Sequence, residues 1–243
     1  MKKVILIVFF FMTTGLLGIA QEHTKTLVAT YIQGYRIPKS VYGIEDKQTK
    51  ENVLKELSKK TSFVLCYQEG KCGFTSSAST TIKKGNFLVS GERGFYMDLK
   101  KREKVSSEVI LDEHFLVHSP LNTIEWNITD EEMEIAGKLC TKATCLSDDG
   151  EVVTAWFCSE MPIPIGPSEY YQGLPGLIFA LEMGNVQYEI QKLEYVQDIK
   201  GITPPSTGRK MEKEQFDKLR EEIYERHKRE LSGNESGVQI IRL

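Results

Sequence analysis

Residues 170–182 read YYQGLPGLIFALE, and in them Gly173, Pro175 and Gly176 stand directly before an apolar run. Pro175 fixes its own φ and pushes the preceding residue toward an extended conformation. Glycine accepts a positive φ, so Pro175–Gly176 suits the centre of a type II turn. A short apolar run bounded by such turn residues is typical of a buried strand. The stretch therefore predicts a sharp bend of the backbone into a strand over residues 177–182.

The same region does not have the pattern of a known catalytic or phosphate-binding loop. Gly166-Pro167 and the later glycines bracket Tyr170 and Tyr171, and no GxGxxG or GK[ST] pattern is present. Phosphate loops precede a helix, whereas this stretch precedes a strand. Ser168 stands in GPSEY, which is not the GxSxG of a nucleophile elbow. We interpret the glycines and prolines as structural residues that aim Tyr170, Tyr171 and Leu174.

The rest of the chain up to about residue 203 consists of short apolar runs separated by turn residues. The runs have the length and spacing of an antiparallel meander, and Asp149-Gly150 gives the clearest hairpin turn. Residues 46–61 interrupt this pattern with apolar residues at helical spacing. We therefore predict a mainly β domain over residues 21–203, with a short surface helix or a hairpin excursion near its start.

Residues 204–243 differ in composition from the β domain. The stretch GITPPSTG is predicted to be a linker, because consecutive prolines cannot continue a strand ladder. The charged stretch that begins at Arg209 is predicted to be an amphipathic helix, followed by a C-terminal tail. Its thin apolar stripe is expected to pack on the parent sheet or, alternatively, on a partner; it comprises Phe216, Leu219, Ile223, His227 and Leu231.

The N-terminus predicts export. Lys2 and Lys3 precede an unbroken apolar run, and Gly18 and Ala20 place small residues before a cut at Gln21. These are the three parts of a signal peptide, here residues 1–20, and the alternative is an N-terminal membrane anchor. No later segment is long enough for a transmembrane helix, so we expect a periplasmic or secreted protein. The net charge of −3 without a basic patch argues against nucleic acid as a partner.

Five cysteines follow the predicted cleavage site, and export makes disulfides chemically possible. Cys66 and Cys72 flank a hairpin-like turn and are a candidate pair across two strands. Cys140, Cys145 and Cys158 lie on adjacent segments and are candidates for a second pair, so the odd count leaves at least one thiol without a partner in the chain. No zinc-ligand spacing is present, and we predict neither a metal nor a cofactor.

Beyond these patterns, the sequence resembles the GLPGLI family (Porph_ging type), exported proteins abundant in Bacteroidetes. The resemblance is specific over roughly residues 120–200, and IEWNI at 124–128, IAGKLCTKA at 135–143, the long stretch 153–182 and QYEIQKLEYV at 187–196 appear in the family's order. The family's common GYxCxKA has Lys138 and Leu139 here, and its AWYT ends here in Phe157 and Cys158. Against that pattern, Cys145 and Cys158 look like additions that form their own disulfide, which leaves Cys140 free.

The resemblance implies an all-β body and an accessory role in the envelope, linked to outer-membrane transport. The succession of hairpins is also similar to the curved half-barrel of the LolA and RseB type, which is a likeness of fold and not of function. The resemblance supplies no catalytic residues. It therefore favours a non-enzymatic protein that holds an outer-membrane transporter, another envelope protein, or a small hydrophobic ligand or peptide.

Two other functions remain as alternatives. An exported, peptidase-like hydrolase would draw on Ser159 or Ser168 with His114 or His118 and an acid such as Asp112, but no local motif joins them. A redox- or stress-responsive envelope factor would act through the odd cysteine.

Aromatic residues crowd the region of the family resemblance and are the binding candidates. On a curved sheet, Trp126, Trp156, Tyr170 and Tyr171 are expected to line a concave apolar face together with Leu174. The alternative is ordinary core packing of aromatics.

Overall fold

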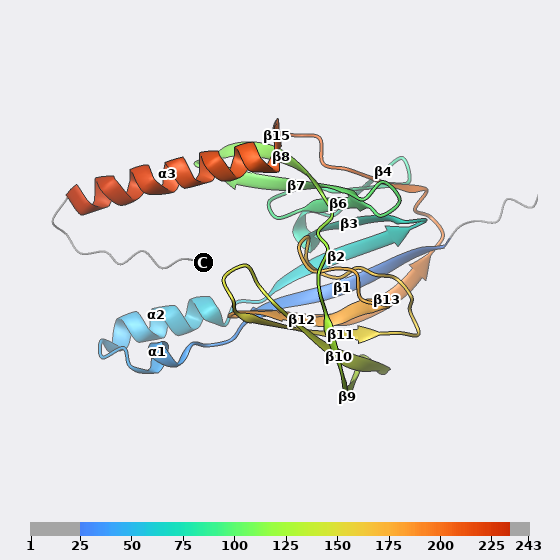
Figure 1. The fold of residues 1–243 in the computed structure, drawn as a ribbon, viewed down its shortest axis with the longest axis horizontal. Helices are drawn as coiled ribbons and strands as arrows, with labels where there is room; N and C mark the ends of the chain where they lie inside the picture. The colour runs from blue at the N-terminus through green and yellow to red at the C-terminus, as the bar shows by residue number, and fades with distance from the viewer. Residues whose placement is uncertain (1–24, 234–243) are drawn as a thin grey trace, which may run out of the picture.

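The computed structural model describes residues 25–233. The predicted signal peptide, residues 1–20, and the tail from residue 234 onward lie outside the described residues. In the described part, the chain forms one large curved sheet, a small second sheet and three α-helices (Figure 1). The predicted mainly β fold with a curved antiparallel sheet and a C-terminal charged helix is confirmed.

The large sheet contains twelve strands in the order β15-β8-β7-β6-β3-β2-β1-β13-β12-β11-β10-β9. Their bounds are β1 Thr26–Tyr35, β2 Thr61–Gln68, β3 Lys71–Ser76, β6 Phe95–Asp98, β7 Glu103–Ile110, β8 Glu113–Pro120, β9 Asn127–Ile135, β10 Lys138–Leu146, β11 Val152–Cys158, β12 Leu177–Met183, β13 Val186–Val196 and β15 Arg209–Glu212. All neighbouring pairs are antiparallel except β15 with β8. The chain passes from β8, next to one edge, to β9, at the other edge, through residues 121–126.

Alternating burial along the strands gives the sheet an inner, concave face. On β1, Leu27, Ala29 and Tyr31 are almost fully buried, whereas Val28 and Thr30 between them are half-buried. This alternation arises because successive side chains of a strand point to opposite faces of the sheet. Their neighbours include Phe74, which stacks on Phe63 at 5.0 Å and lies 4.9 Å from the next ring, Phe95. The inner face is therefore a continuous aromatic and aliphatic core.

The small sheet covers part of the outer face. Its strands are β4 Thr81–Lys83, β5 Asn86–Leu88 and β14 Gly201–Thr203, in the order β14-β5-β4. Phe87 and Ile202 from this sheet pack with Cys66 and Tyr96 of the large sheet in a second hydrophobic cluster. The middle of the large sheet is thus buried on both faces.

The helices lie at the margins of the sheet. Helices α1 (Lys39–Tyr42) and α2 (Lys47–Leu57) follow β1, a one-turn 3₁₀ helix spans Ser77–Ser79, and α3 covers Lys213–Gly233. The predicted C-terminal helix begins four residues later than Arg209, because Arg209–Glu212 rejoin the sheet as β15. Phe216 packs on Phe115, with ring centroids 5.5 Å apart, and Leu219 lies beside it. Of the predicted stripe, Phe216 and Leu219 belong to this cluster, Ile223 is half-buried, and His227 is exposed.

The structure shows none of the predicted disulfides among the described residues, in which all five cysteines have free thiols. In the β2–β3 hairpin, Cys72 stands opposite Tyr67 while Cys66 stands opposite Gly73. This offset of one residue sends the two thiols to opposite faces of the sheet, into different hydrophobic clusters. Cys145 stands opposite Val153, at the far end of the β10–β11 ladder from Cys158. Strand register therefore separates Cys66 from Cys72 and Cys145 from Cys158.

All five thiols are buried, so we expect none of them to react with a thiol-specific reagent in the folded protein. After denaturation without reductant, alkylation followed by intact-mass measurement should find all five thiols modified. A mass short of two or four alkyl groups would contradict the free cysteines. Unmodified thiols in the folded state and full modification after denaturation would distinguish burial from oxidation.

Candidate functional site

The signature loop, defined here as residues 159–176, connects β11 to β12 and lies in the inner face of the curved sheet (Figure 1). Backbone bonds fold it on itself, since Gly173 N–H donates to Pro164 O at 3.0 Å. Two more join it to β12, from Leu177 N–H to Met161 O and from Ile178 N–H to Ile165 O, both at 2.9 Å. The loop therefore fills the core, as the backbone interpretation of its Gly/Pro pattern predicts.

Each glycine of the motif has its own reason. Gly173 has φ +93°, a conformation that other residues rarely adopt. A Cβ on Gly176 would lie 2.1 Å from the carbonyl oxygen of Cys158, and one on Gly166 would lie 2.7 Å from Cβ of Ile178. The predicted type II turn at Pro175–Gly176 is wrong, because the positive φ falls on Gly173 and Gly176 is needed for close backbone approach. Pro167 is buried with Gly166, whereas Pro175 is exposed.

The crossing segment, residues 121–126, holds the loop from one side. Trp126 Nε1–H donates to the carbonyl oxygen of Gln172 at 3.0 Å, and the Gln172 side-chain amide donates to Asn122 O at 3.0 Å. The rings of Trp126 and Tyr171 meet edge to face at 6.2 Å. Leu174 is 1% exposed. These predicted binding residues pack the loop against the crossing segment and the core.

A buried polar cluster holds the loop from the other side. Lys104 on β7 is 1% exposed, donates from Nζ to Glu169 O at 2.9 Å and lies 3.3 Å from the Glu169 carboxylate. Ser106, two residues along the strand, donates to the same carboxylate. The Lys104 ammonium also lies 4.4 Å from the centre of the Tyr170 ring, in a cation–π contact. Sequence reasoning missed this cluster, because its partners are 63 and 65 residues apart.

Helix α3 completes the charge pattern of the polar cluster. Burial and, to a smaller extent, the nearby Glu169 carboxylate raise the pKa of the Glu108 carboxyl to about 7, against the opposing charges of Arg220 and Lys213. Burial also lowers the pKa of Lys104, which Glu169 partly offsets. The cluster therefore joins β7, the signature loop and α3 by charge, and Glu108 titrates near neutral pH.

The predicted binding residues do not share one face. Tyr170 is 37% exposed at the polar cluster, and Trp126 with Tyr171 lies at the crossing segment. Trp156 stands opposite Lys142 in the β10–β11 ladder, with the ammonium 6.0 Å from its ring. The expected concave aromatic surface is instead occupied by the chain itself.

The catalytic candidates are not assembled. Within residues 25–233, no hydrogen bond joins Ser159 or Ser168 to His114 or His118, and Ser168 Oγ accepts from the backbone N–H of Tyr170. The same residues contain no cluster of three His, Cys, Asp or Glu side chains able to hold a metal ion. Burial raises the pKa of the Cys66 and Cys140 thiols to about 12, so neither carries an appreciable thiolate fraction near neutral pH.

Exposed apolar side chains gather at one edge of the large sheet, on strands β9, β10 and β11. Five of the ten large hydrophobic residues exposed in the described part lie on these three strands, distributed over both faces of the sheet: Ile128, Met133, Leu139, Leu146 and Val152. Leu146 and Val152 are cross-strand partners, 69% and 61% exposed. Sequence reasoning missed this surface, because exposure depends on which strands end the sheet.

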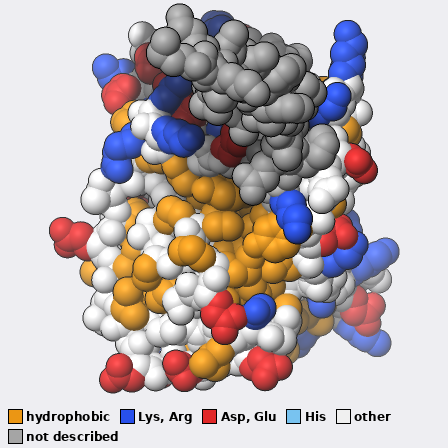
Figure 2. Space-filling model, turned by 90° about the vertical axis from the view of Figure 1, so that its right-hand side faces the viewer, with side chains coloured by type: hydrophobic (Ala, Val, Ile, Leu, Met, Phe, Trp, Pro, Cys, Tyr) orange, Lys and Arg blue, Asp and Glu red, His pale blue; other side chains and the backbone are white. Residues whose placement is uncertain are grey.

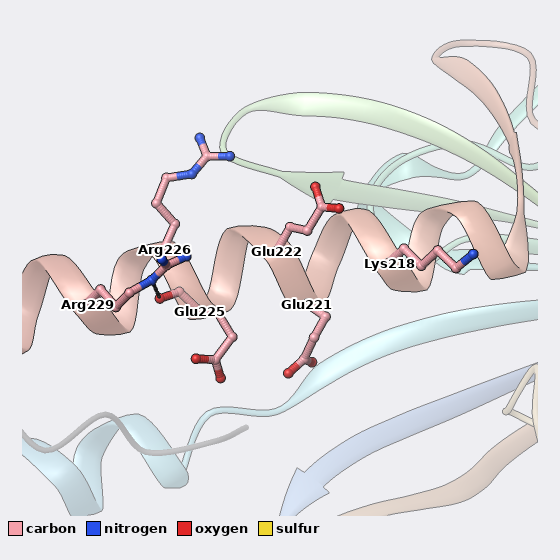
Figure 3. A pocket seen from close by; sticks show the side chains of 6 residues that line it. All are labelled: Lys218, Glu221, Glu222, Glu225, Arg226 and Arg229. Atoms are coloured by element: carbon pink, nitrogen blue, oxygen red, sulfur yellow. Dashed lines mark hydrogen bonds between the residues drawn. The ribbon is translucent and has the colours of Figure 1, made fainter.

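One hollow on the surface is lined by charged rather than apolar side chains. Its described lining residues all come from α3 and are charged: Lys218, Glu221, Glu222, Glu225, Arg226 and Arg229 (Figure 3). The Arg229 Nε–H donates to the backbone oxygen of Glu225 at 3.1 Å. These side chains belong to a solvated helix surface rather than to a converging site.

Comparison with known proteins finds a family model that matches one segment of the chain, and solved structures with a similar fold. Residues 146–180 match the model of Porph_ging, described as a protein of unknown function. The predicted family resemblance is confirmed in this segment. The Porph_ging match covers the β10–β11 turn, β11, the signature loop and the start of β12. No curated protein matches the sequence.

Solved structures resemble the fold. PNGF-II in a C2 space group has a TM-score of 0.52 and 12% identity over 80% of this chain and 32% of that one. PNGF-II in a P21 space group has a TM-score of 0.51 and 14% identity over 80% of this chain and 33% of the other. This chain thus spans about a third of the length of those proteins. At this identity the likeness concerns the β fold alone.

Replacing Gly176 by alanine should destabilise the fold by about 3 kcal/mol, because the new Cβ meets the Cys158 carbonyl group and backbone has to move. Urea unfolding of both proteins measures the difference. Gly34→Ala on β1 is the control, since no atom lies within 4 Å of its added Cβ. Equal stability of the two variants would show that the signature loop does not pack against Cys158 as described.

Glu108→Gln should stabilise the protein at about pH 8 by on the order of 2 kcal/mol and have little effect at about pH 5. The folded-state pKa of Glu108 lies above its ordinary value, so its protonated form is favoured in the folded protein. The wild-type protein therefore keeps its full stability below the pKa that Glu108 has in the unfolded chain, and it loses stability as the pH rises through the folded-state pKa of about 7. Urea unfolding at both pH values tests this, with exposed Glu103→Gln on the same strand as control. A difference independent of pH would contradict it.

Proposed function

We propose that this Porph_ging-type protein is a non-enzymatic accessory protein of the cell envelope, exported by its signal peptide to the periplasm or beyond, which binds another envelope protein. The observation that carries the proposal is the concentration of exposed apolar side chains on β9, β10 and β11, on both faces of this edge of the sheet. Exposed apolar side chains gathered on a few strands are a feature of surfaces that other proteins cover. An outer-membrane transport protein is the partner class that the family resemblance favours.

The packing of the inner face favours a protein partner over a small hydrophobic ligand. The signature loop and the crossing segment fill the concave side, and Leu174 at its centre is 1% exposed. Outside it, Leu146 and Val152 offer apolar area that a partner would remove from water at about 25 cal/mol per Å². Figure 2 shows that hydrophobic side chains with few charges among them also gather at the end of the molecule that forms the right-hand side of Figure 1.

The test is a pull-down from gently solubilised envelope with the purified protein and a variant that makes this surface polar. Leu139→Ser, Leu146→Ser and Val152→Ser together should reduce recovery of the partner at least about tenfold, because its apolar contacts are lost. Mass spectrometry of the bound fraction measures recovery.

The matched control replaces three exposed hydrophobic residues on other elements, Tyr42, Ile82 and Leu111, by serine. It should retain the partner. Recovery that falls equally in both variants, or in neither, would contradict a partner surface on β9, β10 and β11. Thermal unfolding of each variant checks that the fold is kept.

A further inference from the structure

The two edges of the large sheet are built differently. At one edge, β15 has four residues and leads directly into α3. At the other, β9 has nine residues, of which seven are exposed. Within residues 25–233, the backbone of β9 is hydrogen-bonded to no strand other than β10. A long strand with one free row of N–H and C=O groups is a template for another strand, and natural edges are usually short or covered.

A bulge defines which part of β9 presents a regular edge. Glu132 stands opposite Thr141 and Ile128 opposite Ala143, so three residues of β9 face the single residue Lys142. Such an insertion bends the strand and interrupts its pairing pattern. The regular stretch is Glu132–Ile135, whose four residues pair in sequence with Lys138 to Thr141.

The side chains of β9 give this edge a definite chemistry. Of its four carboxylates, Glu131 is bonded to Lys142 Nζ at 2.8 Å and 3.0 Å. In the described part of the chain, Asp130, Glu132 and Glu134 have no ion-pair partner. By strand alternation, Glu132 and Glu134 share one face, while Met133, 42% exposed, lies on the other.

We propose that β9 receives, by strand addition along Glu132–Ile135, an extended segment of the partner protein in which basic residues alternate with apolar ones. The inference rests on the proposed function and names how that partner would bind. Backbone pairing along the free edge provides attraction, and alternation places basic side chains beside Glu132 and Glu134 and an apolar one beside Met133. A second copy of β9 does not fit, because antiparallel edge pairing would set carboxylates against carboxylates.

The probe is a short fluorescein-labelled peptide of alternating lysine and valine, with binding to the purified protein followed by fluorescence anisotropy. We expect the double variant Glu132→Lys/Glu134→Lys to weaken its binding at least about tenfold, because two attractive cross-strand pairs become repulsive. The control, Glu221→Lys/Glu222→Lys on exposed α3, changes the net charge equally and should bind as the wild type does.

A second peptide of the same sequence, N-methylated on alternate residues, keeps the charge but cannot complete a ladder. It should bind at least about tenfold more weakly than the parent peptide. Equal binding of the two peptides, equal weakening in both protein variants, or no binding to the wild type would each overturn strand addition at β9.

These results are separable from a failure of the proposed function. If the peptide does not bind but the envelope partner still depends on Leu139, Leu146 and Val152, the partner surface stands and strand addition is wrong. If the peptide binds as expected but no envelope protein is retained, β9 accepts basic strands and the accessory role is wrong.

Discussion

The inner face of the curved sheet is lined by aromatic and aliphatic side chains, and residues 121–126 and 159–176 exclude water from it. A twisted sheet that curls without closing leaves such a face open, and its apolar area has to be covered by something other than a neighbouring strand. Here the chain covers it with its own connections. The Gly/Pro motif follows from this packing, since Gly176 and Gly166 lie too close to backbone or side-chain atoms for any Cβ.

Apolar packing alone does not fix how the signature loop lies in the inner face, because hydrophobic contacts are not directional. Directional contacts come from both sides of the loop. On one side, Trp126 of the crossing segment bonds to Gln172 of the loop, and Gln172 bonds back to the crossing segment. On the other side, Lys104 of β7 pairs with Glu169 of the loop. A buried ion pair is costly to desolvate, so such a pair contributes more to a unique arrangement than to net stability. The charges of Glu108 and Arg220 extend the same cluster to α3, so loop, sheet and helix share one electrostatic environment.

Local patterns were enough to predict the fold class, the strand that follows the signature loop, and the hairpins at Glu69–Gly70 and Asp149–Gly150, but not β14 and β15. They were not enough wherever the outcome depends on register or on distant contacts. A shift of one residue decides whether Cys66 and Cys72 share a face, and no local pattern reports it. Lys104 is buried because the loop 65 residues later brings Glu169 to it, a contact that the sequence around Lys104 does not indicate. Likewise, the sequence placed Trp126 and Trp156 on one aromatic face. In the structure, Trp126 contacts Tyr171, whereas Trp156 lies beside Lys142.

The open edge at β9 is a consequence of the same topology. The crossing segment carries the chain from β8 to the far side, so β9 begins the second half of the sheet, and later strands fill inward until β13 meets β1. To close the curved sheet into a barrel, β9 would have to pair with the opposite edge, but β15 and α3 already occupy that edge. Within residues 25–233, the sheet therefore ends in a strand whose outer edge is unpaired, and its carboxylates without ion-pair partners disfavour pairing of that edge with a second copy of itself. Acidic side chains that prevent self-association also select for an oppositely charged strand, so protection of the edge and recognition of a partner require the same residues.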